Sequence, residues 1–292
     1  MFYLRYIGVE VMTFIQSIGY PNLIYTNQNY YQESPYERRV NGYGGFNDNN
    51  NGEAYAKTAL SAGLLQVLAS SLNKMSRWLG NRLVNGKEFA SAENVQRVSN
   101  DMVKNNKLDV TVEYITPENA DRLSLKYGIA LDDVAAGKNA FFSAERKLAV
   151  APKSKPSLLP HELGHAINAK SKFWSFMQKS RRFAPIVPLS VLLLSKFGHK
   201  NENGKPNFVE RNAGILGFSA FLPTIMEEGK ASLRGIKQAE KTLANEIKLG
   251  KVNLRVLKRN YLTAWLTYLL AGIGLGIATK YSIVENKLSG KN

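Results

Sequence analysis

The amino-acid sequence predicts an α+β fold that is mostly helical, and three patterns carry this prediction. Patterns typical of helices recur from about residue 54 onward. Among them, an alternating, β-branched run at residues 108–115 and a hairpin-like run at residues 139–152 predict a small β-sheet. Three uncharged apolar stretches follow in the second half of the chain and predict about three membrane-spanning helices. These stretches are residues 183–195, 212–226 and 260–279. Only the last stretch meets the length rule for a spanning helix outright, and the alternative for the two shorter ones is a buried hairpin in a soluble core.

The first 53 residues differ in composition from the rest of the chain. Residues 1–17 begin hydrophobic, but Glu10 lies inside the apolar run and argues against a signal peptide. Residues 18–53 are dense in Asn, Tyr, Gly and Gln, a composition that does not bury a core. We therefore expect a disordered or loosely docked polar arm. The alternative is that tyrosines near Arg38 and Arg39 stack on single-stranded nucleic acid.

Residues 54–151 are expected to form N-terminal helices and the small sheet. The apolar run 59–72 is interrupted by Gln66 and is shorter than the ~20 residues of a spanning helix, so we expect a core or membrane-surface helix. Ser91 is the predicted N-cap of a second helix that ends near Lys104. The following elements are a strand at 108–115, a short helix at 117–127, a loop at 131–138 and a hairpin at 139–152 that turns near residues 144–146.

The stretch HELGHAIN, residues 161–168, contains two of the three histidines in the chain. His161 and His165 are four residues apart, which places both imidazoles on one face of a helix. This pair suits a tetrahedral zinc ion, and Gly164 is expected to keep the surface between the imidazoles small enough for a metal to approach. Because zinc lowers the pKa of a bound water to roughly 7, Glu162 is the candidate general base for peptide hydrolysis. The alternative is a solvated helix with two incidental histidines.

A zinc hydrolase of this kind needs a third protein ligand. The chain has no cysteine, which excludes a disulfide scaffold and leaves histidine and carboxylate as ligands. The third histidine, His199, lies in a polar stretch that is typical of a surface loop. The better source is the stretch MEEGKASLRG at residues 226–235, which emerges directly from an apolar run and offers Glu227 and Glu228.

The pair HELGHAIN and EGKASLRG resembles the motifs of the gluzincin metallopeptidases. It is most similar to the membrane-bound neutral zinc metallopeptidases of the YugP-like group, which combine HExGHAxQ with a downstream E-x-N-A-S-R-R-A. The resemblance covers roughly residues 90–285 and implies a zincin-like fold with one zinc ion per chain. The implied site consists of His161, His165 and Glu228 as ligands, Glu162 as the catalytic base and Ser232 in a supporting position.

The chain departs from that family pattern at several places. Lys230 stands where the family has Asn, and Gly235 stands where it has Ala. Glu227 remains a competitor of Glu228 for the third ligand position. The family typically begins with a membrane helix, whereas this chain begins with a polar arm. The resemblance further implies that the strand just before the zinc helix pairs with an extended substrate, and the alternative is a hairpin that is only structural.

The charge distribution indicates an anionic partner and an orientation. Lys and Arg outnumber Asp and Glu by 39 to 23, which favours an anionic membrane leaflet over nucleic acid as the partner. Residues 152–182 carry seven Lys and Arg, residues 229–259 carry nine, and the opposing segment 199–211 carries three. The positive-inside rule therefore predicts that both motifs share the cytoplasmic side. Residues 229–249 are expected to form an amphipathic helix that Gly250 ends.

The sequence thus predicts an integral membrane zinc endopeptidase, in the cell membrane, that acts on protein or peptide substrates at the cytoplasmic surface. Arg234 is a candidate for stabilising the oxyanion, although it could instead pair with a lipid phosphate. The alternative function is a non-catalytic membrane scaffold that retains the peptidase fold. The expected segments are a polar arm at 1–53, N-terminal helices and sheet at 54–151, the peptidase domain at 152–285 and a tail at 286–292.

Overall fold

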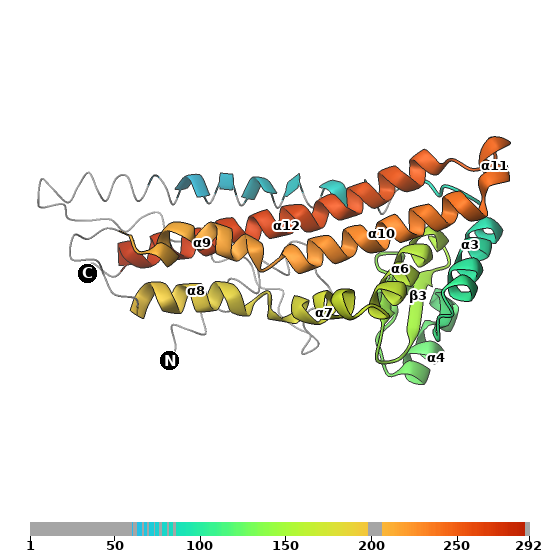
Figure 1. The fold of residues 1–292 in the computed structure, drawn as a ribbon, viewed down its shortest axis with the longest axis horizontal. Coiled ribbons are helices and arrows are strands. Elements are labelled where there is room, and N and C mark those ends of the chain that lie inside the picture. The colour runs from blue at the N-terminus through green and yellow to red at the C-terminus, as the bar shows by residue number, and fades with distance from the viewer. Residues whose placement is uncertain are drawn as a thin grey trace, which may run out of the picture.

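The structure, a computed structural model, describes residues 86–197 and 206–289 as two unbroken ranges. Upstream of them it describes residues 60, 63–65, 67–68, 70–72, 74–75, 78–80 and 82–83, which are helical as the sequence predicts. The predictions for the polar arm and for His199 lie outside the described residues. The described part is mostly helical and contains one small sheet at one end of an elongated molecule (Figure 1).

The sheet has three strands in the order β1-β3-β2. These are β1 (Thr111–Ile115), β2 (Phe141–Ser143) and β3 (Leu148–Pro152), so the predicted strand and hairpin are confirmed. Strand β3 pairs in parallel with β1 and antiparallel with β2. The expectation that the strand just before the zinc helix pairs with substrate is therefore wrong for residues 148–150 of β3, because both of their backbone edges already pair with β1 and β2.

Three helices accompany the sheet. Helix α3 (Ala92–Asn105) begins as predicted at Ser91, whose Oγ accepts a hydrogen bond from the Asn94 amide at 3.4 Å. Helix α4 (Pro117–Tyr127) is also confirmed. The predicted loop at 131–138 is wrong in its first half, where the short helix α5 (Asp132–Ala135) forms. This turn is stable because Val134 packs into the same buried apolar cluster as α4 and β3.

Helix α6 (Leu159–Ala169) carries the HELGH motif and follows a single 3₁₀ turn at Pro156–Leu158. Helix α7 (Lys172–Ser180) and a second 3₁₀ turn, η3 (Arg181–Phe183), come next. The predicted amphipathic helix is found as α10 (Leu222–Thr242) and α11 (Ala244–Lys248), and Gly250, with a φ of 69°, ends it as expected.

Helices α6 and α10 touch through their backbones. A Cβ atom at Gly164 would lie 2.4 Å from the carbonyl oxygen of Ala231, and one at Gly235 would lie 3.1 Å from the carbonyl oxygen of Pro160. Only glycine allows so close an approach at position 164, and a Cβ atom at position 235 would make a tight contact. Gly164 therefore serves the contact between two helices, and the expectation that it lets a metal approach stays a prediction.

One helix in the described part of the chain is long and apolar enough to span a membrane. It is the segment Leu254–Val284 of helix α12 (Leu254–Ser289). Helices α8 (Ile186–Phe197) and α9 (Phe208–Ser219) have 12 residues each, or about 18 Å, which is short of the ~30 Å of a bilayer core. In place of the predicted three, the described residues thus contain one helix that is long and apolar enough to span a membrane. The apolar stretch 212–226 is divided, because α9 ends at Ser219 and α10 starts anew at Leu222 with Pro223 in its first turn.

The long helices lie side by side along the molecule. Helix α12 packs along α9 and α10, and α8 packs on α9, while α3, α4, α6 and the sheet gather at the opposite end (Figure 1). Between these two parts, α10 runs from the helical bundle to α6. The residues of the HELGH motif therefore meet α10 where the two parts of the molecule join.

Candidate metal centre

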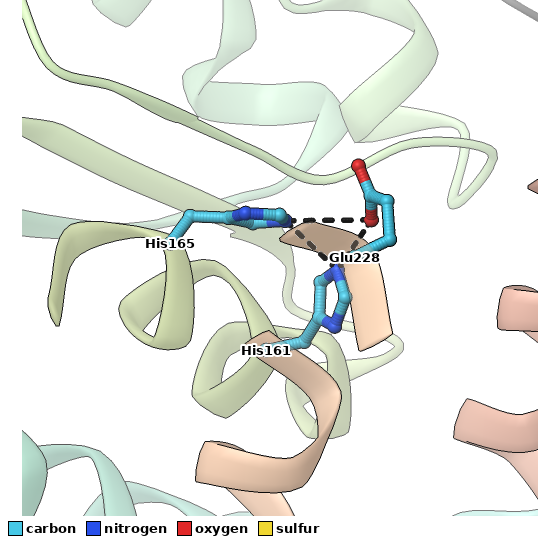
Figure 2. A group of neighbouring side chains, drawn as sticks. All are labelled: His161, His165 and Glu228. Carbon is cyan, nitrogen blue, oxygen red and sulfur yellow. Dashed lines mark hydrogen bonds and ion pairs between the residues drawn. The ribbon is translucent and has the colours of Figure 1, made fainter. Parts of the chain in front are cut away.

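Two helices bring three potential ligands together. His161 and His165 lie one turn apart on α6, and their Nε2 atoms are 3.0 Å from each other. Glu228, on α10, places its Oε2 atom 3.2 Å from His161 Nε2 and 3.5 Å from His165 Nε2 (Figure 2). The three side chains thus form a group that could hold a metal ion.

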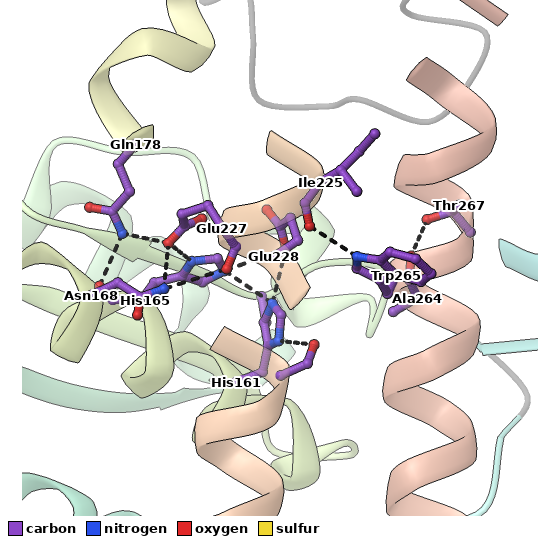
Figure 3. Close-up of polar contacts among 12 residues, drawn as sticks. His161, His165, Asn168, Gln178, Ile225, Glu227, Glu228, Ala264, Trp265 and Thr267 are labelled. Carbon is purple, nitrogen blue, oxygen red and sulfur yellow. Dashed lines mark hydrogen bonds and ion pairs between the residues drawn. The ribbon is translucent and has the colours of Figure 1, made fainter. Parts of the chain in front are cut away.

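The second nitrogen of each imidazole has its own polar partner. His165 Nδ1 lies 2.6 Å from Glu227 Oε1 (Figure 3). His161 Nδ1 lies 3.1 Å from Ser232 Oγ. When these oxygens accept the Nδ1 protons, both Nε2 atoms are left with lone pairs that point at each other and at Glu228. Outer partners of this kind fix the tautomer of metal-binding histidines.

The distances within the group suit a small tetrahedral cation. At zinc–ligand distances of about 2.0–2.1 Å, the corners of a tetrahedron lie roughly 3.3 Å apart. The observed separations of 3.0, 3.2 and 3.5 Å between donor atoms bracket that value. The residues present therefore fit zinc, although two imidazoles and a carboxylate also bind other divalent metals.

The structure gives the two neighbouring glutamates different positions. Glu227 is completely buried, and its Oε1 atom also accepts hydrogen bonds from Asn168 Nδ2 at 3.1 Å and from Gln178 Nε2 at 2.8 Å (Figure 3). Its carboxylate is thus held on the Nδ1 side of His165. Glu228 occupies the Nε2 side, so the geometry favours Glu228 over Glu227 as the third ligand.

Sequence reasoning missed Arg181, which connects both glutamates. Its Nη1 atom lies 3.1 Å from Glu227 Oε2, and its Nη2 atom lies 2.8 Å from Glu228 Oε1. The arginine comes from η3, which is separated from Glu227 by 46 positions. One feature of the sequence could have pointed to this bridge. No acidic residue occurs in residues 171–197, so an acidic partner of Arg181 has to come from elsewhere in the chain.

The charges around His161, His165 and Glu228 favour a cation between these three side chains. Although burial alone raises the pKa of Glu228, Arg181 and His165 hold it well below its usual value, so the carboxylate is ionised. Burial acts to lower the pKa of His165, but Glu227 and Glu228 outweigh it and raise this pKa well above the usual value. A proton or a metal cation therefore competes for the same position.

Glu162 lies beside the group on α6. It is 7% exposed, and within the described ranges no side chain forms a hydrogen bond with its carboxylate. Burial raises the pKa of Glu162, while His161 and His165 act in the opposite direction. A buried carboxylate without a protein donor, next to a metal group, can accept a proton from water.

Arg234 does not take the position expected for an oxyanion donor. Its Nε atom donates a hydrogen bond to Asn168 Oδ1 at 2.7 Å, and Asn168 in turn donates to Glu227. Arg234 therefore supports the network on the Nδ1 side of His165. Ser232, by contrast, is found in the supporting position that the family resemblance implies, against His161.

Comparison of the chain with family models, with curated proteins and with solved structures finds no match. The resemblance to gluzincin metallopeptidases rests on the two sequence motifs. The geometry described above stands independently of that resemblance.

Proposed function

We propose that this protein is a membrane-bound, zinc-dependent metalloendopeptidase. One observation carries the proposal: three lone-pair atoms of His161, His165 and Glu228 converge, and the buried carboxylate of Glu162 is near enough to interact electrostatically with all three residues. A structural metal site would not need a carboxylate at position 162 that has no protein partner among the described residues. The zincin-like character of the fold belongs to the same proposal.

The residues of the chain divide the work of peptide hydrolysis among them. Zinc, when bound, lowers the pKa of a water to roughly 7 and polarises the scissile carbonyl. Glu162 accepts the proton of that water and returns it to the leaving amine. Glu227 and Ser232 keep the imidazoles in the tautomer that turns Nε2 to the metal. Arg181 keeps Glu228 ionised and aimed at the same place.

We also propose that the helical part of the molecule lies in a lipid bilayer. Helix α12 is long enough to span it, and many large apolar side chains on the neighbouring helices are exposed, which water disfavours over so wide a surface. They include Phe173, Phe176, Phe183, Ile186, Leu193, Leu194, Phe208 and Ile215, and Leu262 is exposed on α12 itself. The basic segments 152–182 and 229–259 would then contact anionic lipid on the cytoplasmic side of the cell membrane, with no nucleic-acid partner.

The test compares full-length wild type, Glu162→Gln and Glu145→Gln after purification in detergent. Glu145 is an exposed residue of the β2–β3 turn and serves as the matched control. Zinc content is measured together with cleavage of an unfolded, membrane-tethered reporter. We expect about one zinc per chain in all three proteins and a loss of cleavage of roughly 10²-fold or more in Glu162→Gln alone.

Two other results would change the assignment. Zinc binding without cleavage by any of the proteins would favour a non-catalytic scaffold that keeps a structural metal. Absence of zinc from all three proteins, with no gain on metal addition, would refute the metal site itself.

A further inference from the structure

The segment formed by α7 and η3, residues 172–183, has no fully buried residue. It follows α6 after a short connection and leads into α8, along the edge of the molecule (Figure 1). A helix that buries so little apolar surface gains little stabilisation in water. Within the described residues, the segment contacts α6 and α10, while its large apolar side chains on the outer side stay exposed.

One face of this segment combines large apolar side chains with positive charge. Phe173, Phe176 and Phe183 are 51%, 65% and 51% exposed, at spacings that place them on one side of the helical run. Exposed Lys172, Lys179 and Arg182 belong to the same segment. We call these six residues the outward stripe. Aromatic rings interleaved with cations are typical of segments at the boundary between lipid and water.

The surroundings of the outward stripe favour an anionic bilayer as the partner. No acidic residue occurs between positions 171 and 197, and the exposed apolar surface continues into α8 at Ile186 and Leu189. An anionic headgroup layer over an apolar interior complements both properties at once. A soluble protein partner would complement the charge but not the apolar continuation along α8.

The inward side of the same segment reaches the metal group. Gln178 donates a hydrogen bond to Glu227, and Arg181 bridges Glu227 and Glu228. The segment 172–183 thus turns aromatic and basic side chains outward, where they suit an anionic bilayer. On its inner side it binds the carboxylates of Glu227 and Glu228.

The candidate metal ligands His161, His165 and Glu228 also lie beside one end of the apolar stretch of α12. Trp265 Nε1 donates a hydrogen bond at 2.9 Å to the carbonyl oxygen of Ile225, which is one turn before Glu228 (Figure 3). Trp265 lies near the start of the uncharged stretch 260–279. If that stretch fills the bilayer core, the segment 172–183 falls at the level of the headgroups.

We propose that the outward stripe binds the anionic surface of a bilayer, and that this contact holds Arg181 and Gln178 against the glutamates of the metal group. Lipid would then regulate the site, because the zinc affinity depends on how firmly Glu227 and Glu228 are oriented. The inference rests on the proposed function in assigning zinc to this group and in placing α12 in a bilayer.

The lipid contact is tested first, independently of zinc. Because the chain has no cysteine, Phe176→Cys provides a single labelling site for a fluorophore in the full-length protein. Leu125→Cys is the matched control, since Leu125 is 86% exposed on α4 at the sheet end. In vesicles of phosphatidylcholine with 30% phosphatidylglycerol, we expect lipid-borne quenchers to quench the probe at 176 and not the probe at 125. Equal quenching of the two probes would overturn the proposal, as would protection at 176 that follows protein concentration instead of lipid, which indicates a second copy.

The coupling to the site is tested by zinc competition with a chromophoric chelator in the same vesicles. We compare wild type with the triple variant Lys172→Gln, Lys179→Gln, Arg182→Gln. The control removes the same charge from exposed residues at the sheet end, as Lys104→Gln, Arg122→Gln, Lys138→Gln. In wild type and control, phosphatidylglycerol should raise the zinc affinity about tenfold or more, and the outward-stripe variant should lose this increase.

Variants of Arg181, which bridges Glu227 and Glu228, distinguish an effect on the position of the two glutamates from an effect on the folding of the protein. Arg181→Ala should lose the lipid-dependent increase in zinc affinity, and Arg181→Lys should restore part of it, because a single ammonium replaces one of the two contacts. Zinc affinity that is equal in both lipids and in all variants would overturn the proposal and leave the peptidase assignment intact. Absence of zinc binding in every protein would instead refute the proposed function on which the inference rests.

Discussion

The two ends of the molecule bury opposite kinds of side chain. We call the sheet, α3, α6 and the residues packed on them the sheet half, and α8, α9 and residues 260–284 of α12 the helical half. In the sheet half the core consists of large side chains that are completely buried, including Met102, Leu159, Leu163 and Leu257. Its solvent-facing side chains are mostly polar or charged, as expected for a domain folded in water.

The helical half packs with small residues and turns large ones outward. A Cβ atom at Gly276 would lie 2.6 Å from the carbonyl oxygen of Gly214, and one at Gly217 would lie 2.4 Å from Thr279 Oγ1. Leu194 and Ile215 are meanwhile 57% and 69% exposed. Small residues at contacts between helices are typical of membrane proteins, where lipid solvates the large apolar side chains equally well. The difference supports the proposal that the two halves lie in two solvents, water and lipid, with the candidate metal group where the two halves meet.

The largest effect should come from removing apolar volume in the sheet half. Leu163→Ala leaves a cavity in a completely buried position and should lower the free energy of unfolding by about 2–5 kcal/mol. Leu194→Ala, the same change at an exposed position of α8, should stay within about 0.5 kcal/mol. Unfolding in mixed micelles of increasing sodium dodecyl sulfate measures both. Equal costs would break the comparison, because they would mean that α8 also carries a closed core.

A charge placed on the outer surface should reveal the solvent of each half. Ile215→Lys on α9 should cost about 2.5–3.5 kcal/mol if its environment is hydrocarbon. The same substitution at Leu125, which is 86% exposed on α4, should cost less than about 0.5 kcal/mol. The readout is the fraction of each variant that resists extraction of the membrane with alkaline carbonate. Normal retention of Ile215→Lys would place α9 in water.

Close helix contacts occur in both halves, and they should have different functional effects. Gly164→Ala and Gly276→Ala each force a Cβ against a backbone carbonyl, at a cost of about 1–3 kcal/mol. Only Gly164→Ala should also weaken zinc binding, because it moves α10 and with it Glu228 away from α6. Zinc affinity is measured for both variants under conditions where both remain folded. A loss of zinc affinity in Gly276→Ala as well would show that the helical half positions the ligands.

The smallest effect should come from the hydroxyl that supports His161. Ser232→Ala removes the partner of His161 Nδ1 and should lower the zinc affinity about tenfold, or about 1.4 kcal/mol. Ser282→Ala is the control from the helical half, since its Oγ only donates to the carbonyl oxygen of Ala278 within α12. Chelator competition should separate the two variants. Unchanged affinity in Ser232→Ala would mean that packing alone orients His161.

The features that the sequence predicts correctly are local ones. The spacing of His161 and His165 fixes their relation within one helix, whatever the rest of the chain does. The hairpin at 139–152 and the N-cap at Ser91 likewise depend on neighbouring residues. By contrast, the helical start at Leu222 was not predicted, because composition alone does not show that an apolar stretch contains a break.

The parts of the site that depend on tertiary packing could not be predicted. Glu227 and Glu228 point about 100° apart around α10, so the choice between them depends on how α10 crosses α6. That crossing is set by the contact of Gly164 with Ala231, which no local pattern reveals. Arg181 was missed for the same reason, since both of its carboxylate partners come from another helix.

The separation of His161 and Glu228 by 67 positions has a consequence for biosynthesis. The ribosome completes α6 first, then α8 and α9, and only afterwards the first turns of α10. A nascent chain that stops before α10 therefore carries two of the three ligands and has no carboxylate of Glu227 or Glu228 to orient them. On the proposed function, the hydrolase acquires its metal only after the chain has turned back through the helical half, so catalytic competence follows membrane assembly.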